Sequence, residues 1–405
     1  MTLETAAKTT RYIEQEDQYG ANNYHVLDVV CTRGEGIWLT DVDGRRYMDF
    51  LAAYSAVNQG HNHPRIAEAM IRQIRTLALT SRAFRNDQLP PLLEKLCRLS
   101  GFDKALLMNG GAEAVETAIK AMRKWGYEVK GIEYPRAEII VADGNFHGRT
   151  TTIVGFSTDP TATAGFGPFT PGFKVVPFGD LDAVAKAITP HTAAIFMEPV
   201  QGERGTLIPP AGFLMGLRRL ADQHQCLLVL DEIQSGFGRT GKMFAFEHEG
   251  IRPDGITVGK ALSGGFYPVS AFLASNEVMD VFTPGIHGST YGGNPLACAV
   301  ASVALDVLVD EKLVQRSAEL GIHFKARLEA IKSPKVAAVR CIGLWAGIDL
   351  AEDAGPAKDY CHALKERGLL CKDTHLRTIR MAPPLVITRD ELDWAVDQLE
   401  AVLGA

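Results

Sequence analysis

The sequence predicts an α/β protein of two packed domains, a large one built on a mostly parallel sheet and a smaller α+β one. Three observations support this prediction. The chain has 405 residues, more than most single domains contain. From about residue 100, short apolar runs alternate with helical patterns, as in doubly wound folds. From about residue 296 the pattern becomes long and helical instead.

Short and almost continuously apolar runs predict the strands of the large sheet. They lie at 139–142, 193–197 and 227–230. Runs that are apolar at every position are typical of parallel strands covered on both faces.

A helix with one buried face is predicted at 113–127. Val115, Ala118, Ile119 and Met122 follow the i, i+3, i+4, i+7 spacing of such a face. Helical stretches after residue 296, β-like runs at 336–348 and an amphipathic segment from Arg389 indicate the smaller domain. We therefore expect a large domain at 49–295 and a small domain at 296–405, with the N-terminal segment 1–48 belonging to the small one.

Composition excludes several classes of protein. Apolar residues make up 46% and charged residues 22% of the chain, and the net charge is -6, which favours neither nucleic acid nor an anionic membrane as partner. No apolar run approaches the roughly 18 to 20 residues that span a bilayer, and the first 20 residues lack the pattern of a signal or transit peptide. The seven cysteines are scattered without a CxxC pair, so we expect reduced thiols, no metal site and a cytoplasmic location.

One acidic residue and one lysine form the sharpest local signal. Asp231 directly follows the apolar run 227–230, and ligands of open α/β sheets bind at the carboxyl ends of strands. Lys260 follows the apolar run 256–258 and precedes Gly264 and Gly265, which let a backbone pass close to a ligand. A pyridinium cofactor needs an anion at its ring nitrogen and a lysine amine that holds it as an imine. The alternative is a helix-capping aspartate and a surface lysine.

Two glycine-rich stretches could hold a phosphate. Asn109, Gly110, Gly111 and Ala112 run directly into the predicted helix, whose first N–H groups can bind an anion. The stretch 287–294 offers hydroxyl groups as further donors. Each of them alone is also typical of an ordinary turn or loop.

Together these motifs resemble the class III aminotransferases, which are fold-type I pyridoxal-phosphate enzymes, over nearly the whole chain. The matching segments lie at 41–44, 109–114, 145–150, 198–203, around Asp231 and Lys260, and at 287–295. The segments 19–25, 54–61 and 379–385 are most similar to those of family members that take ornithine as the amino donor.

The resemblance implies a pyridoxal 5'-phosphate site in the large domain. Lys260 would form the Schiff base, Asp231 would pair with the ring nitrogen, Phe146 would stack on the ring, and Gln234 would contact the side of the phenolic oxygen. Gly111, Ala112 and the Thr290 of a neighbouring subunit would hold the phosphate. A phosphate site shared between chains implies a homodimer or a larger homo-oligomer.

The resemblance also implies that the chain moves the δ-amino group of L-ornithine to 2-oxoglutarate. The products would be glutamate 5-semialdehyde, which cyclises to pyrroline-5-carboxylate, and glutamate. Other donors, namely N-acetylornithine, 4-aminobutyrate or lysine, remain alternatives, as does a binding protein without catalysis.

The substrate residues are implied in the same way. Tyr24 and Arg149 would lie at the α-carboxylate of ornithine, with Tyr54 lining the pocket. Glu203 would neutralise Arg380 until 2-oxoglutarate enters, because guanidinium groups bind carboxylates in pairs of hydrogen bonds. Arg380 would then take its α-carboxylate and Arg149 the distal one. Without the resemblance, these charges would be interpreted as surface ion pairs.

Two positions depart from the family pattern. Arg204 follows Glu203 where a small residue is expected, and this second cation could compete with Arg380 for Glu203. Gly110 stands where many relatives carry Ser or Thr, which removes one hydroxyl donor.

Overall fold

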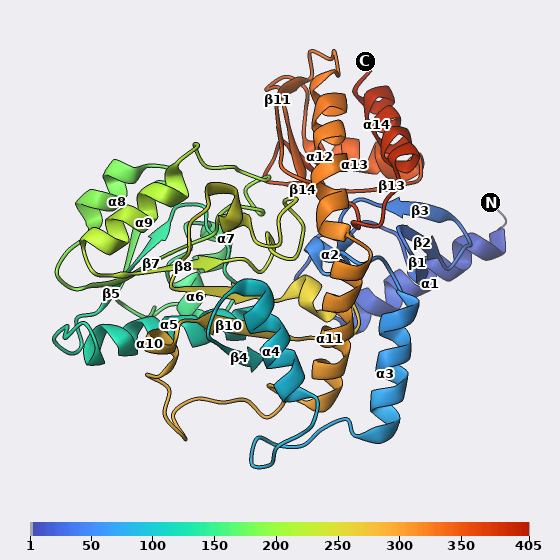
Figure 1. The fold of residues 1–405 in the computed structure, drawn as a ribbon. Helices are drawn as coiled ribbons and strands as arrows, with labels where there is room; N and C mark the ends of the chain where they lie inside the picture. Colours follow the sequence, from blue (N-terminus) through green and yellow to red (C-terminus); the bar gives the residue numbers. More distant parts are fainter. Residues whose placement is uncertain (1–2, 405) are drawn as a thin grey trace.

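The computed structural model describes residues 3–404 and contains three sheets flanked by helices (Figure 1). The largest sheet has seven strands in the order β4-β10-β9-β8-β7-β5-β6. Their bounds are β4 Lys104–Met108, β5 Glu138–Ala142, β6 Phe173–Val176, β7 Thr192–Met197, β8 Leu227–Asp231, β9 Gly255–Val258 and β10 Ser270–Ala274.

The sheet is mostly parallel, as the sequence predicts. Strands β5 to β9 pair in parallel, and β10 runs antiparallel to both of its neighbours, β4 and β9. The predicted runs at 139–142, 193–197 and 227–230 are β5, β7 and β8, which confirms those three strands.

Helices cover both faces of this sheet because successive side chains of a strand point to opposite sides. On one face, α5 (Gly111–Glu128) packs over residues that include Ile139, Val141 and Val229. On the other face, α8 (Leu181–Ala187) and α9 (Phe213–Gln223) pack over Ile140 and its alternating neighbours (Figure 1). Both faces are buried, which explains why each strand is apolar at almost every position.

The C-terminal part contains an antiparallel sheet of order β11-β12-β15-β14. The long helix α11 (Pro295–Asp310) packs on α3 and α4 and leads into α12. The elements that follow are α12 Leu313–Glu329, β11 Val336–Cys341, β12 Ala346–Leu350, α13 Ala357–Glu366, β14 Lys372–Thr374, β15 Thr378–Met381 and α14 Arg389–Leu403.

The N-terminal part shares a sheet with the C-terminal part. Strands β1 (Cys31–Glu35), β2 (Trp38–Asp41) and β3 (Arg46–Asp49) form a meander, and β13 (Leu369–Leu370) pairs in parallel with β3. This pairing supports the predicted assignment of 1–48 to the same unit as 296–405, which stays a prediction.

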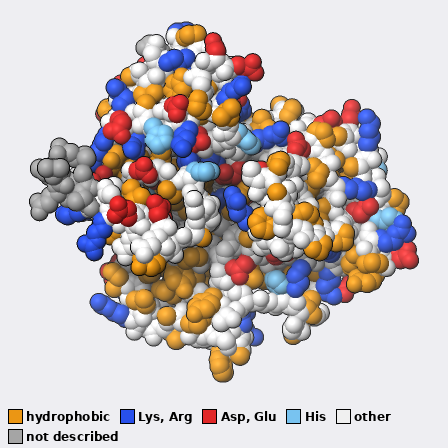
Figure 2. All heavy atoms as spheres, turned by 180° about the vertical axis from the view of Figure 1, so that it is seen from behind, with side chains coloured by type: hydrophobic (Ala, Val, Ile, Leu, Met, Phe, Trp, Pro, Cys, Tyr) orange, Lys and Arg blue, Asp and Glu red, His pale blue; other side chains and the backbone are white. Residues whose placement is uncertain are grey.

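The remaining elements are short or lie at the edges of the molecule. They are α1 Leu3–Tyr19, α2 Ala52–Ser55, α3 Pro64–Thr76, α4 Leu89–Ser100, α6 Thr151–Val154, α7 Pro160–Thr163, η1 Ala245–Glu249, η2 Lys260–Ser263 and α10 Asn276–Met279. Seen from behind, the surface carries interspersed acidic and basic side chains and is hollowed near its middle (Figure 2). Among residues 3–404, no helix is long and apolar enough to cross a membrane.

Candidate active site

A cavity of about 200 Å³ lies where β7, β8 and β9 end and α5 begins. The carboxyl ends of parallel strands meet at one edge of a sheet, where ligands of such folds bind. Six of the residues predicted to hold the cofactor line this one cavity: Gly111, Ala112, Phe146, Asp231, Gln234 and Lys260.

Asp231 is the last residue of β8 and is held by three hydrogen bonds. Its Oδ1 accepts from the backbone N–H of Ile233 and the hydroxyl of Thr257, both at 3.0 Å. Its Oδ2 lies 2.6 Å from Nδ1 of His147. Hydrogen bonds to a carboxylate stabilise its charged form. These contacts fix the position of the Asp231 carboxyl group at the cavity, although only 5% of the residue is exposed.

His147 is a site residue that the sequence analysis did not single out. Its ring stacks on Phe196 with centroids 4.4 Å apart, and its Nε2 is buried without a hydrogen-bond partner among the described residues. The only available signal was its position inside the segment 145–150. Its contact with Asp231 depends on how β8 lies beside the loop after β5, and sequence spacing does not show this.

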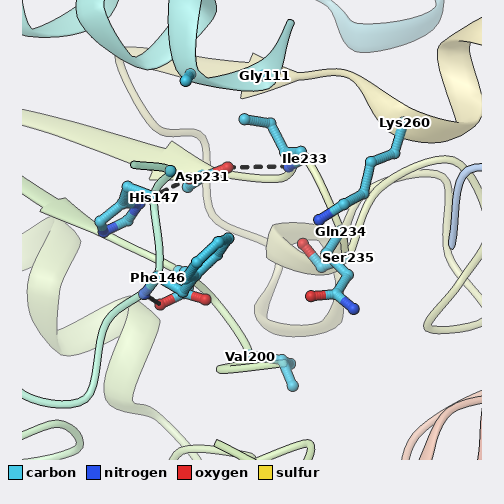
Figure 3. A pocket seen from close by; sticks show the side chains of 12 residues that line it. Gly111, Phe146, His147, Val200, Asp231, Ile233, Gln234, Ser235 and Lys260 are labelled. Atoms are coloured by element: carbon cyan, nitrogen blue, oxygen red, sulfur yellow. Dashed lines mark hydrogen bonds and ion pairs between the residues drawn. The ribbon is translucent and has the colours of Figure 1, made fainter. Parts of the chain in front are cut away.

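Two apolar side chains give the cavity the shape of a slot. Figure 3 shows Phe146 and Ile233 facing the pocket from opposite sides, with Asp231 and Lys260 reaching it from different elements. Ile233 was not predicted. A Cβ at position 111 would lie 3.1 Å from Cδ1 of Ile233, so the glycine lets the start of α5 approach this wall closely.

Lys260 is the first residue of η2, just after β9, and it has a backbone conformation that residues with a side chain rarely adopt. Its φ of 43° lies in the left-handed region, and such strain is concentrated at functional sites. Burial is the largest influence on its amine and lowers the pKa, while the negative charges of Glu203 and Asp231 act in the opposite direction. The net lowering makes the neutral, nucleophilic amine easier to reach.

The start of α5 provides an anion site. Gly111 and Ala112 are its first residues, and the first N–H groups of an α-helix have no acceptor inside the helix. The side chain of Glu113 instead accepts from the N–H groups of Asn109 and Gly110, at 3.0 and 2.8 Å. The N–H groups that reach the cavity are thus those of Gly111 and Ala112. Thr290 is exposed and does not line the cavity of this protomer.

Gln234 packs against Gly202, a position at which there is no room for a side chain. A Cβ at position 202 would lie 2.2 Å from Oε1 of Gln234 and 2.6 Å from the buried ring of Trp345. The close approach of the loop at Gly202 therefore fixes one side of the Gln234 amide.

Arg380 and Glu203 form an ion pair beside the cavity. Nη1 of Arg380 lies 2.8 Å from Oε1 of Glu203, and the guanidinium lies 5.0 Å from the centroid of the Tyr54 ring. Arg380 is 3% exposed, and its Nε is buried without a partner within the described chain. The predicted pairing of Glu203 with Arg380 is thus present in the structure, whereas Tyr54, which was expected to line the pocket, lies against Arg380 and does not line the cavity.

Two other predicted substrate residues lie at the surface. Tyr24 is 66% exposed, and Arg149 is exposed with its guanidinium 5.7 Å from the centroid of the Phe146 ring. The guanidinium of Arg149 therefore lies over the ring that forms one wall of the slot. Neither residue lines the cavity.

Arg204 does not compete for Glu203. Its Nη1 lies 3.3 Å from both the backbone oxygen and Oδ2 of Asp143. The interpretation of Arg204 as a second cation acting on Glu203 is wrong, because its guanidinium lies across Gly144 and pairs with the loop after β5.

The residues around the cavity match a ligand with a flat, protonated ring and a phosphate group. A flat ring fits between Phe146 and Ile233, a protonated ring nitrogen fits at Asp231, a phosphate fits at the start of α5, and Lys260 provides the amine. This is the arrangement of a pyridoxal-phosphate-dependent enzyme.

Comparisons with known proteins narrow the class to a family. Residues 19–403 match the model described as aminotransferase class-III. An ornithine aminotransferase from Bordetella pertussis is 57% identical over 98% of this chain and 97% of its own length. The chain belongs to the class-III aminotransferase family, whose members use pyridoxal phosphate and take amino acids and oxo acids as substrates.

Solved structures agree with this fold. The ornithine aminotransferase from Toxoplasma gondii superimposes with a TM-score of 0.96 at 43% identity, over 98% of this chain and 94% of that one. An acetylornithine aminotransferase from Elizabethkingia anophelis gives a TM-score of 0.90 at 52% identity, over 98% of each chain.

Proposed function

We propose that this chain is an ornithine δ-aminotransferase. It moves the δ-amino group of L-ornithine to 2-oxoglutarate, giving glutamate 5-semialdehyde, which cyclises to pyrroline-5-carboxylate, and glutamate. Curated ornithine aminotransferases at 52% to 57% identity over 98% of the chain support this reaction.

The observation that carries the choice of substrates is the ion pair of Glu203 with Arg380. The two substrates of this reaction differ at the end that reacts with the cofactor. The reacting carbon of ornithine carries an amine and no carboxylate, whereas the keto carbon of 2-oxoglutarate is bonded directly to a carboxylate. An arginine already paired at 2.8 Å cannot attract the carboxylate of ornithine, so the amine end is favoured. When 2-oxoglutarate binds, Glu203, the more exposed partner at 30% against 4%, is the side chain free to move away.

Arg149 and Tyr24 are proposed to bind the other end of each substrate. Arg149 lies over the ring of Phe146, where the guanidinium can receive the α-carboxylate of ornithine or the distal carboxylate of 2-oxoglutarate. Tyr24 is exposed and can add a hydroxyl contact. Tyr54 lies under Arg380 and keeps this guanidinium plane in place.

When bound, pyridoxal phosphate supplies an electron sink for the bond that is broken next to the amine. Lys260 would hold the cofactor and move a proton between the substrate carbon and the cofactor, a role that its lowered pKa favours. Asp231 would keep the ring nitrogen protonated, and Phe146 with Ile233 would hold the ring flat and exclude water. Gly111 and Ala112 would bind the phosphate, and Gln234 would lie near the phenolic oxygen.

We also propose a homodimer or a larger homo-oligomer in which Thr290 serves the phosphate site of the partner. Thr290 is exposed, and the glycine-rich segment 287–294 that contains it does not contribute to the cavity of its own protomer. We infer a cytoplasmic location, because all seven cysteines are free thiols, of which five are buried.

N-acetylornithine is the alternative donor with a specific observation behind it, namely the acetylornithine aminotransferase at 52% identity. Acetylation of the α-amine removes a positive charge beside the α-carboxylate but leaves the δ-amine unchanged. The ion pair of Glu203 with Arg380 fits both donors, so a measurement has to separate them.

The test incubates cofactor-loaded protein with 2-oxoglutarate and ornithine, N-acetylornithine, 4-aminobutyrate or lysine, and follows glutamate and pyrroline-5-carboxylate. Turnover mainly with ornithine supports the proposal, and turnover only with another donor rejects ornithine while keeping the aminotransferase. Glu203→Gln serves as the mechanistic variant. With Arg380 unpaired, we expect less pyrroline-5-carboxylate from ornithine while 2-oxoglutarate still binds, and an unchanged product yield would contradict the proposed role of the ion pair.

A further inference from the structure

Two carboxyl groups line the same cavity but have different surroundings. Asp231 and Glu198 are both buried, with 5% and 7% of each residue exposed. Asp231 meets three hydrogen-bonding groups, from His147, Ile233 and Thr257. The second carboxyl, Glu198, lies just beyond the end of β7 and has no part in the family roles described above.

Glu198 has little to stabilise a negative charge. Its Oε2 accepts one hydrogen bond, from the backbone N–H of Phe146 at 3.1 Å. No donor within residues 3–404 meets its other oxygen. Burial raises the pKa of Glu198 well above its ordinary value, and the negative charge of Asp231 raises it further. Glu203 acts in the same direction, while Lys260 and the N–H of Phe146 act against it.

When two carboxyl groups share a site, the proton goes to the one whose surroundings stabilise the anion less. Asp231 has three hydrogen-bonding partners and Glu198 has one, so the negative charge is assigned to Asp231 and the proton to Glu198. We propose that Glu198 is an uncharged carboxylic acid at neutral pH, and that its neutrality allows a dicarboxylate oxo acid to enter the cavity.

The charges around the cavity explain this role. Lys260 and Arg380 are the basic groups close to Glu198 and its neighbours, and Asp231 and Glu203 are the acidic ones. His147 is held by Asp231. The oxo acid brings two negative charges and, on the proposed function, displaces Glu203 from Arg380. An ionised Glu198 would add a third carboxylate to a buried site and oppose its binding.

The first measurement uses the cofactor and needs no substrate. The pH at which the visible absorbance of the lysine-bound cofactor changes responds to nearby charges, since removing an anion lowers the pKa of a cation. Glu198→Gln is expected to leave this pH unchanged, because it removes no charge. Glu203→Gln removes a carboxylate that acts on Lys260, so it serves as the control that must lower the pH. An equal lowering by Glu198→Gln would overturn the proposal.

The second measurement follows how the Michaelis constant for the oxo acid changes from neutral to alkaline pH, with whichever donor the enzyme turns over. In the unmodified enzyme Glu198 loses its proton as pH rises, so this constant should rise on the order of tenfold, the effect of about one pKa unit of interaction. In Glu198→Gln it should show no such rise, and all other titrating groups are common to both proteins. Parallel profiles of the two proteins would reject the role in oxo-acid binding.

This inference rests on the proposed function only for the identity of the oxo acid. A donor other than ornithine would reject the proposed donor and leave both measurements on Glu198 valid. If Glu198→Gln does not fold, the infrared carbonyl band of a protonated carboxylic acid decides instead, measured in Glu232→Gln so that the other buried carboxyl group with a raised pKa does not contribute. Loss of that band at high pH with a matching rise in the Michaelis constant supports the proposal, and its absence at neutral pH overturns it.

Discussion

Arg204 and Asp143 join the loop after β7 to the loop after β5, with 3.3 Å between Nη1 of the arginine and Oδ2 of the aspartate. Each loop carries a residue of the proposed site, Glu203 in one and Phe146 in the other. The ion pair therefore braces the two loops from outside, while Glu203 keeps its contact with Arg380.

Arg204→Ala should lower the free energy of unfolding by less than about 1 kcal/mol, because the two side chains are 37% and 43% exposed and such pairs are weak. The yield of pyrroline-5-carboxylate from ornithine should not change, since Glu203 still pairs with Arg380. Denaturant melts and assays of pyrroline-5-carboxylate measure both effects, with Asp143→Ala and the double variant completing a mutant cycle. A loss of product as large as that of Glu203→Gln would show that Arg204 acts on the ion pair.

Gly202→Ala should weaken cofactor binding and cost about 1 to 3 kcal/mol of stability. The added methyl group would collide with Oε1 of Gln234 and the ring of Trp345, which is 1% exposed. Titration of the apoprotein with pyridoxal phosphate, together with thermal melts, tests this. Gly212→Ala is the control, because its Cβ meets nothing within 4 Å and only its left-handed φ of 82° is strained. Equal cofactor affinities of the two variants would contradict the prediction.

Glu232 should make the protein less stable as pH rises. It is 0% exposed, and burial raises its pKa from 4.5 to about 7. Between these two values the unfolded chain releases the proton and the folded chain keeps it, so the free energy of unfolding falls, by roughly 3 kcal/mol over the interval. Above about pH 7 both states are ionised and the loss is complete.

Glu232→Gln should remove this part of the pH dependence. The measurement is denaturant unfolding at pH about 5 and about 8, with the stability of the variant gaining on the unmodified protein at the higher pH. Glu352→Gln, at a side chain that is 92% exposed, is the matched control and should change nothing. The same pH profile in Glu232→Gln and the unmodified protein would refute the prediction.

Hybrid dimers should recover activity from two inactive parents. Lys260→Ala removes the catalytic amine, and Thr290→Asp places a negative charge at the proposed phosphate contact of the partner. In a hybrid, the protomer with intact Lys260 receives an intact Thr290, so one of the two sites is complete. Random pairing of equal amounts should give about a quarter of the normal activity. No activity in isolated hybrids would place Thr290 within its own protomer's site.

Much of the large sheet follows from local patterns. The runs that became β5, β7 and β8 are apolar throughout because both faces of the sheet are covered, and this signal is present in the sequence. The direction of β10 cannot be predicted from its sequence, because a short apolar run such as Ser270–Ala274 looks the same whether it pairs in parallel or antiparallel.

The residues of the site also divide into those that local sequence patterns indicate and those that depend on contacts between distant segments. Asp231 and Lys260 stand next to apolar strands and were found from their positions, while Phe146 and Gln234 came from the resemblance. His147, Ile233 and Glu198 matter through contacts between separate strand ends, which no spacing in the chain encodes. The partner of Arg204 was missed for the same reason, since Asp143 lies far from it in the chain.

The parallel pairing of β13 with β3 affects the order in which the protein can assemble. Strands β1 to β3 leave the ribosome long before β13, the strand that completes their sheet, has been synthesised. At roughly 5–20 residues per second, the N-terminal strands wait for tens of seconds with one edge unpaired. Edges of this kind bind other chains readily, so the growing chain passes through a period in which it depends on chaperones or on dilution to avoid aggregation.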